Sequence, residues 1–335
     1  MTSFVARLLA LLFLCFALDA RADTISAMKA SRHFDCGAIQ NIDDWSAENI
    51  HGDLSGLATE ICRAVAVAIF GDASGLAVRE FPGELEAVDA LTSGKIQLAV
   101  GVSPSAAVAM KFGLAYARPI FFDSQRFLVA RQSGVADLAG LRDKVICALD
   151  MTPPERTLRD EMTAREIPYA LVAHSEQGEM DAAVAVGRCA GTALESRLAQ
   201  SRAAFHARVS DFVFLPERLS LAPIAPAYLA KDADFGLLVD WTISALIEAE
   251  ALGITQANVA DALKRADMRA EQLLGGDFAT AQAFGLAHDW AAKVVATTGN
   301  YGEIFRRTVG EPYRLDRGLN ALWTQGGLMT PAPMK

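Results

Sequence analysis

The chain has 335 residues, of which 52% are hydrophobic, and its formal net charge at pH 7 is −9. A chain of this length and apolar content can bury one large core or two ordinary ones. Its acidic balance, without blocks of basic residues, argues against nucleic acid as a partner.

The N-terminal segment has the pattern of a secretory signal peptide. Arg7 precedes the unbroken apolar run Leu8–Leu18, and Ala20-Arg21-Ala22 follows as a small-residue cleavage signature. The run has about the 7–15 residues of a signal peptide and is too short to cross a bilayer. We therefore expect residues 1–22 to be removed before Asp23 and the mature protein to be periplasmic, with an uncleaved membrane anchor as the alternative.

The next hundred residues predict alternating strands and helices. The predicted elements are a strand in Ser31–Gly37, a helix in Gly56–Phe70, a strand at Leu76–Phe81, a helix at Glu84–Thr92 and a strand at Ile96–Val102. This β-α-β-α-β order predicts a mainly parallel sheet with helices on its faces.

A second unit of the same kind follows. Its predicted strands are Phe121–Ala130, Lys144–Leu149, Tyr169–His174 and Gly191–Leu194, and its predicted helices are Glu155–Arg165 and Met180–Val186. The section after Leu237 reads as mostly helical, with a strongly apolar helix over Trp241–Leu252.

Two candidate crossovers between the units lie near Arg118-Pro119 and between Pro216 and Pro226. We therefore expect an α/β fold of two lobes, each a mainly parallel sheet flanked by helices. Residues 23–119 would begin the first lobe, 120–221 would form the second, and 222–335 would complete the first and add a helical C-terminal extension. Ligands of such folds lie between the lobes, at the carboxyl ends of strands.

Four cysteines follow the signal segment, and an even number in an oxidising compartment favours two disulfides. Three pairings are possible, and proximity in the sequence favours Cys36–Cys62 and Cys147–Cys189; four buried free thiols are the alternative. No two cysteines have the spacing of a zinc motif, and the five histidines form no H-x-H or H-E-x-x-H pair, so no metal site is predicted. No catalytic motif is present, which predicts neither an enzyme nor a cofactor.

Several strings in the C-terminal half resemble a known family. Trp241–Val259, Gly299–Val309 and Arg317–Leu328 look like the general L-amino-acid-binding proteins of ABC importers, the type II periplasmic binding proteins of solute-binding protein family 3. The resemblance extends over essentially the whole mature chain and implies the same two disulfides. It implies a monomer that captures an amino acid or a related small polar or cationic solute by closing two lobes and delivers it to a membrane permease.

The resemblance also implies a ligand site. The aromatic residue that covers the ligand side chain falls on Trp45, and the acid that holds the α-ammonium group falls on Glu195. The Gly-Thr-Thr turn that binds the carboxylate falls on Met151-Thr152-Pro153, where the hydroxyl of Thr152 survives. Ser103, which follows a predicted strand, faces the same region in the family.

One expected residue is missing. The arginine that clamps the α-carboxylate should fall near Val108 or Ala109, yet Ser103–Met110 (SPSAAVAM) contains no cation. Pro153 and Pro154 also remove two backbone donors. Since a buried carboxylate without its cation costs several kcal/mol, we expect weak or absent binding of ordinary α-amino acids. The ligand would be less anionic, more apolar, or a cation facing Glu195 and Trp45.

Two other functions remain open at this point. The scaffold could act through a periplasmic protein partner, such as a sensor or a redox enzyme, without feeding a transporter. A cyclohexadienyl dehydratase-like lyase is a further alternative, although the missing cation near Val108 argues against it.

Overall fold

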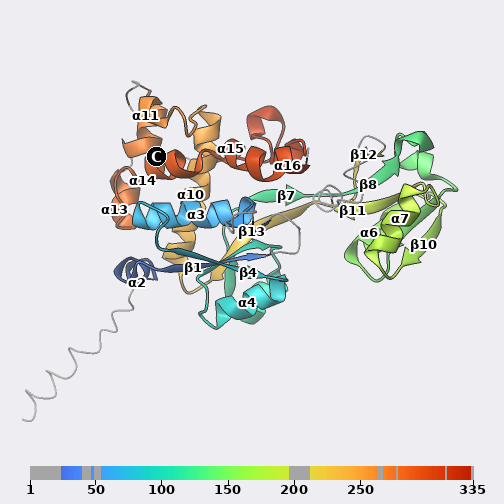
Figure 1. The fold of residues 1–335 in the computed structure, drawn as a ribbon, viewed down its shortest axis with the longest axis horizontal. Coiled ribbons are helices and arrows are strands. Elements are labelled where there is room, and N and C mark those ends of the chain that lie inside the picture. The colour runs from blue at the N-terminus through green and yellow to red at the C-terminus, as the bar shows by residue number, and fades with distance from the viewer. Residues whose placement is uncertain are drawn as a thin grey trace, which may run out of the picture.

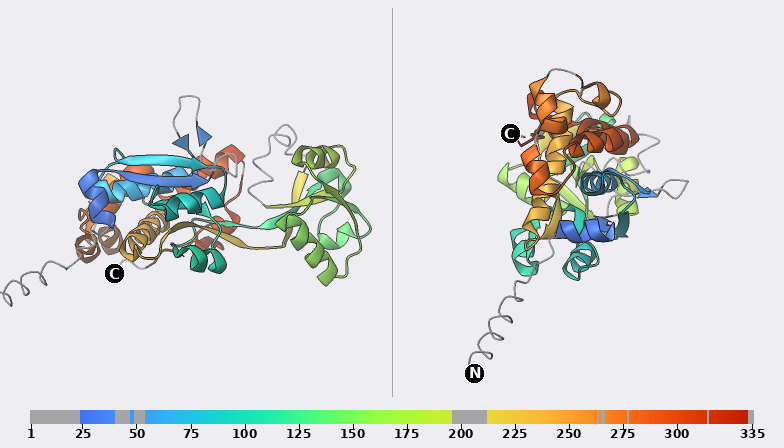
Figure 2. Two further views of the ribbon diagram at one scale, coloured as in Figure 1. Left: turned by 90° about the horizontal axis from the view of Figure 1, so that it is seen from below. Right: turned by 90° about the vertical axis from the view of Figure 1, so that its left-hand side faces the viewer.

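The computed structural model describes residues 24–39, 47–48, 54–195, 212–262, 264, 267–276, 278–313 and 315–332. These residues form two α/β lobes (Figure 1). Figures 1 and 2 show the second lobe at one end of the long axis, joined to the first by the strands β7–β8 and β12–β13. The two-lobed architecture expected from the sequence is confirmed. No described helix is long and apolar enough to cross a membrane.

The strands are β1 (Phe34–Ile39), β2 (Ala47–Glu48), β3 (Leu54–Ser55), β4 (Leu76–Phe81), β5 (Leu98–Val102), β6 (Leu114–Tyr116), β7 (Phe121–Asp123), β8 (Gln125–Ala130), β9 (Val145–Leu149), β10 (Ala170–His174), β11 (Gly191–Glu195), β12 (Phe212–Arg218) and β13 (Ala222–Leu229). The α-helices are α2 (Thr24–Ser31), α3 (Leu57–Phe70), α4 (Glu84–Thr92), α5 (Ala106–Phe112), α6 (Pro153–Ala164), α7 (Gln177–Ala185), α10 (Ala233–Ala251), α11 (Val259–Ala262), α12 (Met268–Glu271), α13 (Phe278–Ala283), α14 (Trp290–Thr298), α15 (Tyr301–Phe305) and α16 (Glu311–Tyr313). Short 3₁₀ or π turns are η1 (Arg131–Ser133), η2 (Leu138–Leu141), η4 (Gln272–Gly276), η5 (Arg306–Gly310), η6 (Gly318–Asn320) and η7 (Trp323–Gln325).

The first lobe is built on a sheet of order β4-β1-β5-β13-β6, with β7 also paired to β13. β1 runs parallel to β4 and β5, whereas β13 is antiparallel to β5 and β6. β1 and β5 are buried along their whole length, as expected for strands covered on both faces. The Cys36–Cys62 disulfide joins β1 to α3 with the two Cα atoms 6.0 Å apart.

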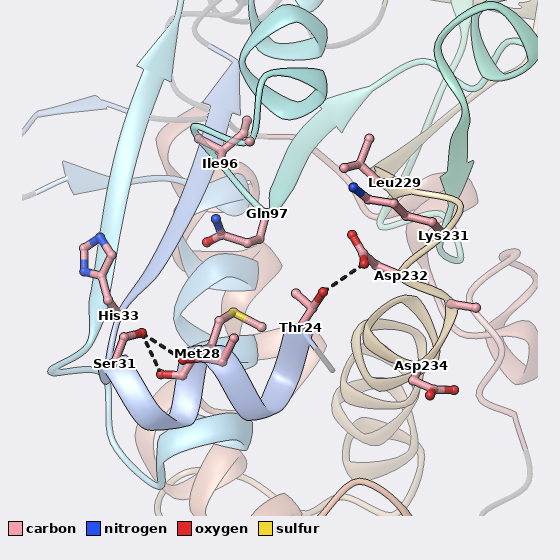
Figure 3. Close-up of a pocket in the computed structure, with 13 residues that line it drawn as sticks. Thr24, Met28, Ser31, His33, Ile96, Gln97, Leu229, Lys231, Asp232 and Asp234 are labelled. Carbon is pink, nitrogen blue, oxygen red and sulfur yellow. Dashed lines mark hydrogen bonds between the residues drawn. The ribbon is translucent and has the colours of Figure 1, made fainter. Parts of the chain in front are cut away.

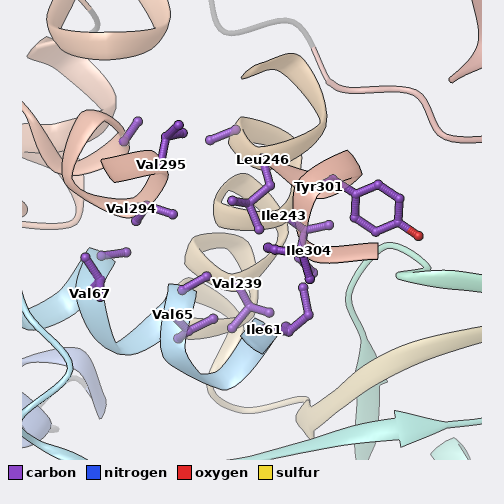
Figure 4. Packing of buried hydrophobic residues seen from close by; sticks show 14 of the residues in the cluster. Ile61, Val65, Val67, Val239, Ile243, Leu246, Val294, Val295, Tyr301 and Ile304 are labelled. Carbon is purple, nitrogen blue, oxygen red and sulfur yellow. The ribbon is translucent and has the colours of Figure 1, made fainter. Parts of the chain in front are cut away.

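The core of the first lobe lies between α3 and the helices that follow the second lobe in the sequence. Figure 4 shows Ile61 and Val65 of α3 against Val239 and Ile243 of α10, with α14 and α15 closing the cluster. α3 ends at Gly71, whose φ of 82° lies in the left-handed region that glycine adopts without strain. The C-terminal helices therefore belong to the core of the first lobe.

The second lobe has a sheet of order β10-β9-β11-β8-β12. β9, β10 and β11 are parallel, and β8 is antiparallel to β11 and β12. Side chains of α6 and α7 belong to two separate buried clusters. Successive residues of β8 and β9 alternate between these clusters, so the two helices cover opposite faces of the sheet. The Cys147–Cys189 disulfide links β9 to the turn before β11, with the Cα atoms 5.7 Å apart, so both predicted pairs are confirmed.

The chain passes between the lobes at two places, which we call the crossing segments: Ser124, between β7 and β8, and residues 219–221, between β12 and β13. The sequence predicted one strand over Phe121–Ala130, and that prediction is wrong: β7 pairs in the first sheet and β8 in the second. The helix α2 was not predicted, because it is short and only weakly amphipathic.

Candidate functional site

The carboxyl ends of the parallel strands in both lobes point toward the crossing segments. In the first lobe Val102, the last residue of β5, lies opposite Ala225 near the start of β13. In the second lobe Glu195, the last residue of β11, lies opposite Gln125, the first residue of β8. The residues that directly follow these strands, which we call the interlobe edges, are where α/β proteins bind ligands.

Ser103 lies on the interlobe edge of the first lobe, and its polar groups are already engaged. Its backbone N–H and its hydroxyl both donate to Oε1 of Glu84, over 3.0 and 2.8 Å. Glu84 is the first residue of α4, where a carboxylate interacts favourably with the helix dipole. Glu84 was not among the predicted ligand residues; the available signal was an acid at the first helical position after a strand.

The helix α5 follows Ser103 on the same edge. Ser105 caps it by accepting a hydrogen bond from the Val108 N–H over 3.4 Å. Met110 is 88% exposed, and the Lys111 ammonium lies 4.9 Å from the centre of the Phe112 ring at the far end of the helix. The helix that was expected to carry a carboxylate-binding arginine near Val108 therefore carries an exposed thioether instead.

In the second lobe Thr152 caps α6. Its hydroxyl donates to the Leu149 carbonyl over 2.7 Å and accepts from the Glu155 N–H over 3.4 Å. The carboxylate of Glu155 is buried and bonds to Arg159 over 2.6 Å. This hydrogen bond raises the pKa of the Arg159 guanidinium. The first turn of α6 thus already contains a buried carboxylate of the protein itself, that of Glu155.

Gln125 connects the crossing segment to this turn. Its side-chain amide donates to the Pro154 carbonyl over 2.6 Å, and its backbone N–H donates to the Ser220 hydroxyl over 3.2 Å. Because Gln125 is only 3% exposed, these bonds are shielded from water. They fix the position of the first turn of α6 relative to both crossing segments.

Of the four predicted ligand residues, the structure brings Ser103 and Thr152 to the two interlobe edges, one on each lobe. Trp45 lies outside the described residues. Glu195 ends β11 at the interlobe edge, while its side chain lies outside the description.

One group of potential metal ligands is found among the described residues. Cys147, His174 and Cys189 hold their ligand atoms within 4.8 Å of one another, and His174 Nε2 lies 3.3 Å from Cys147 Sγ. The two sulfurs are joined in the disulfide, so the group offers no thiolate to a metal. The spacing of the sequence did not reveal it, because its members come from three separate segments.

A pocket of about 840 Å³ lies at the opposite, amino edge of the first sheet (Figure 3). His33 and Gln97, which line it, directly precede β1 and β5. The Thr24 hydroxyl donates to Asp232 over 2.8 Å at one side of it. This pocket is therefore separate from the interlobe edges.

No family model matches the chain. The chain is 32% identical over 330 residues, 95% of each chain, to the general L-amino acid-binding periplasmic protein AapJ of Rhizobium johnstonii. It is 32% identical over 321 residues, 94% of each chain, to the glutamate/glutamine/aspartate/asparagine-binding protein BztA of Rhodobacter capsulatus.

Among solved structures, an ABC transporter periplasmic binding protein from Brucella ovis with glutathione bound superposes with a TM-score of 0.78 and 32% identity. The match covers 94% of this chain and 100% of that one. Shared sequence and shared architecture thus extend through both lobes and the C-terminal helices. The chain therefore belongs to solute-binding protein family 3, the periplasmic amino-acid-binding proteins of ABC importers.

Proposed function

We propose that this protein captures a small amino-acid-related solute between its lobes and delivers it to the membrane permease of an ABC importer. The observation that carries this proposal is the 32% identity to an amino-acid-binding periplasmic protein across 95% of both chains. The orientation of the strand ends supports it, because both lobes turn their carboxyl edges toward the crossing segments.

Closure would take place at the crossing segments. Asp123, Ser124 and Gln125 are buried at one of them, and the two lobes have separate hydrophobic cores. Two packed bodies joined by short strand crossings rotate as rigid units, with the change of backbone angles confined to a few residues. Each lobe would supply half of the ligand site.

The ligand contacts would come from both edges. In this proposal Trp45 covers the apolar part of the solute, Glu195 holds its ammonium group, and Ser103 and Thr152 line the two edges. The hydroxyls of Ser103 and Thr152 already have protein partners, so they would orient the walls of the site more than grip the solute.

Export and maturation complete the proposal. Residues 1–22 would direct secretion and be cleaved before Asp23, leaving a monomer in the periplasm with residues 23–119 and 222–335 around the lobe of 120–221. The two disulfides support an oxidising compartment. Intact-mass measurement of the protein from a periplasmic extract tests the cleavage; a mass that includes residues 1–22 would contradict it.

A thermal-shift screen tests the binding function. The mature chain is mixed with amino acids, amines derived from them, and small peptides including glutathione. A ligand that binds only the folded state raises the melting temperature by mass action, so at least one compound should give a saturable shift. A panel without any response would contradict the proposed function.

A further inference from the structure

We infer that the interlobe site selects a cationic amine that lacks a carboxylate next to its ammonium group, and that Glu84 determines this selectivity. The inference rests on the proposed function and concerns the same site. It follows from the charges and donors that the described residues place on the two interlobe edges.

The first lobe presents a fixed anion. Oε1 of Glu84 is held by two hydrogen bonds from Ser103, so the carboxylate stays at the edge. Among the residues that the structure describes, Glu84 makes no ion pair. Ser103–Met110 contains no lysine or arginine, and the next residue, Lys111, has its ammonium over the Phe112 ring. An unpaired carboxylate attracts a ligand ammonium and repels a ligand carboxylate.

The first turn of α6 offers few free backbone donors to a ligand carboxylate. A helix N-terminus ordinarily binds anions through its free N–H groups. Here Pro153 and Pro154 have no N–H, the Glu155 N–H donates to the Thr152 hydroxyl, and the Glu155 carboxylate occupies the first turn. Asp150, directly after β9, is an exposed acid at this edge.

Apolar side chains complete both edges. Met151 is 84% exposed two residues after β9, Leu85 is 68% exposed four residues after β4, and Met110 is 88% exposed on α5, the helix that follows β5. Flexible methionine thioethers suit contact with a methylene chain. The combination of the fixed Glu84 carboxylate with exposed apolar groups fits an alkyl amine or diamine, whose charge is at the end of an apolar stem.

Arg156 is a described cation that could reverse this selectivity, as is the exposed Lys111 in the last turn of α5. Arg156 lies in the first turns of α6, is exposed, and has no ion pair among the described residues. If it faced the ligand, it could bind a carboxylate. A variant at Arg156 therefore belongs in the test.

Isothermal titration of the mature chain with matched pairs tests the inference: putrescine against ornithine, cadaverine against lysine, and agmatine against arginine. Each pair differs only by the α-carboxylate. We expect at least one amine to bind about tenfold more tightly than its amino acid, or more, which corresponds to about 1.4 kcal/mol. If the amino acids bind more tightly, the inference is overturned while the proposed function stands, and loss of that binding in Arg156→Gln would show which cation is responsible. If no compound of the whole screen binds, both fail.

A variant identifies the residue responsible. Glu84→Gln keeps an oxygen acceptor for Ser103 but removes the charge, so amine affinity should fall about tenfold with little change in melting temperature. Asp89→Asn, an exposed acid in the last turn of the same helix, is the matched control and should bind as the parent does. Unchanged affinity in Glu84→Gln, or an equal loss in both variants, would overturn the assignment of Glu84.

Discussion

Tyr301 connects the C-terminal helices to the strand that leads into the second lobe. Its side chain is fully buried, and its hydroxyl donates to the Ile120 carbonyl over 2.7 Å, directly before β7. The Arg317 guanidinium lies over the same ring, 5.2 Å from its centre. Burial raises the pKa of the Tyr301 phenol above its ordinary value of 10.0.

Replacing Tyr301 by Phe should lower the free energy of unfolding by about 1–2 kcal/mol, because the buried Ile120 carbonyl loses its donor. Urea unfolding at neutral pH measures this. An unchanged midpoint would show that the hydrogen bond does not contribute to stability.

The same residue predicts a pH dependence. The phenol ionises in the unfolded chain from about pH 10 but stays neutral when folded, so its contribution is complete below pH 10 and is lost as the pH rises above it. The loss of stability between pH 9.5 and 11 should be less steep in Tyr301→Phe, although not absent, since burial also raises the pKa of Tyr228. Parallel curves for the two proteins would contradict this prediction.

At the scale of elements, α6 depends on its N-cap. Thr152→Ala should lower the free energy of unfolding by about 1 kcal/mol, whereas Thr152→Ser keeps the hydroxyl and should be close to neutral. Urea unfolding measures the stability of each variant, and isothermal titration with a ligand found in the thermal-shift screen measures its affinity. A loss of affinity in Thr152→Ala without a loss of stability would make the hydroxyl a ligand group instead of a cap.

The Cys147–Cys189 disulfide ties the centre of the second sheet together across 42 residues of sequence. Replacing both cysteines by Ser should cost about 4 kcal/mol by the chain-entropy estimate. Because the buried clusters of the second lobe are smaller than the core of the first, that lobe should unfold first. Limited proteolysis should then cut within residues 125–195; first cuts in the first lobe would contradict this.

At the scale of the whole molecule, the two lobes have separate sheets, and in the part of the chain that the structure describes they are joined by the crossing segments and their flanking strands. A saturating ligand should therefore reduce the radius of gyration measured by small-angle X-ray scattering, because closure brings the two bodies together. The non-binding member of a matched pair is the control. Equal radii with and without a bound ligand would exclude closure as the mode of capture.

Much of the local structure could be predicted, because residues that interrupt strands and helices mark the ends of these elements in the sequence. The strand Leu76–Phe81 and the helix Glu84–Thr92 occur with the predicted bounds, since Pro82-Gly83 and Ser93-Gly94 interrupt the chain there. The helix α2 was missed because it depends on tertiary contacts, such as the buried side chain of Ile25 and the bond from Thr24 to Asp232. The apolar run Phe121–Ala130 was read as one strand because nothing local marks Ser124 as a crossing.

The sequence alone determined the alternation of strands and helices, and with it the parallel centre of each mixed sheet, and it favoured the disulfide pairs and the family that the structure and the relatives confirm. These follow from periodicity, turn residues and shared strings, which act over short stretches of chain. Only the tertiary structure decided which polar groups at the interlobe edges already have hydrogen-bond partners within the protein. Ser103 bonds to Glu84, 19 residues away, because the ends of two parallel strands converge at one edge of a sheet, and no spacing in the sequence reveals that.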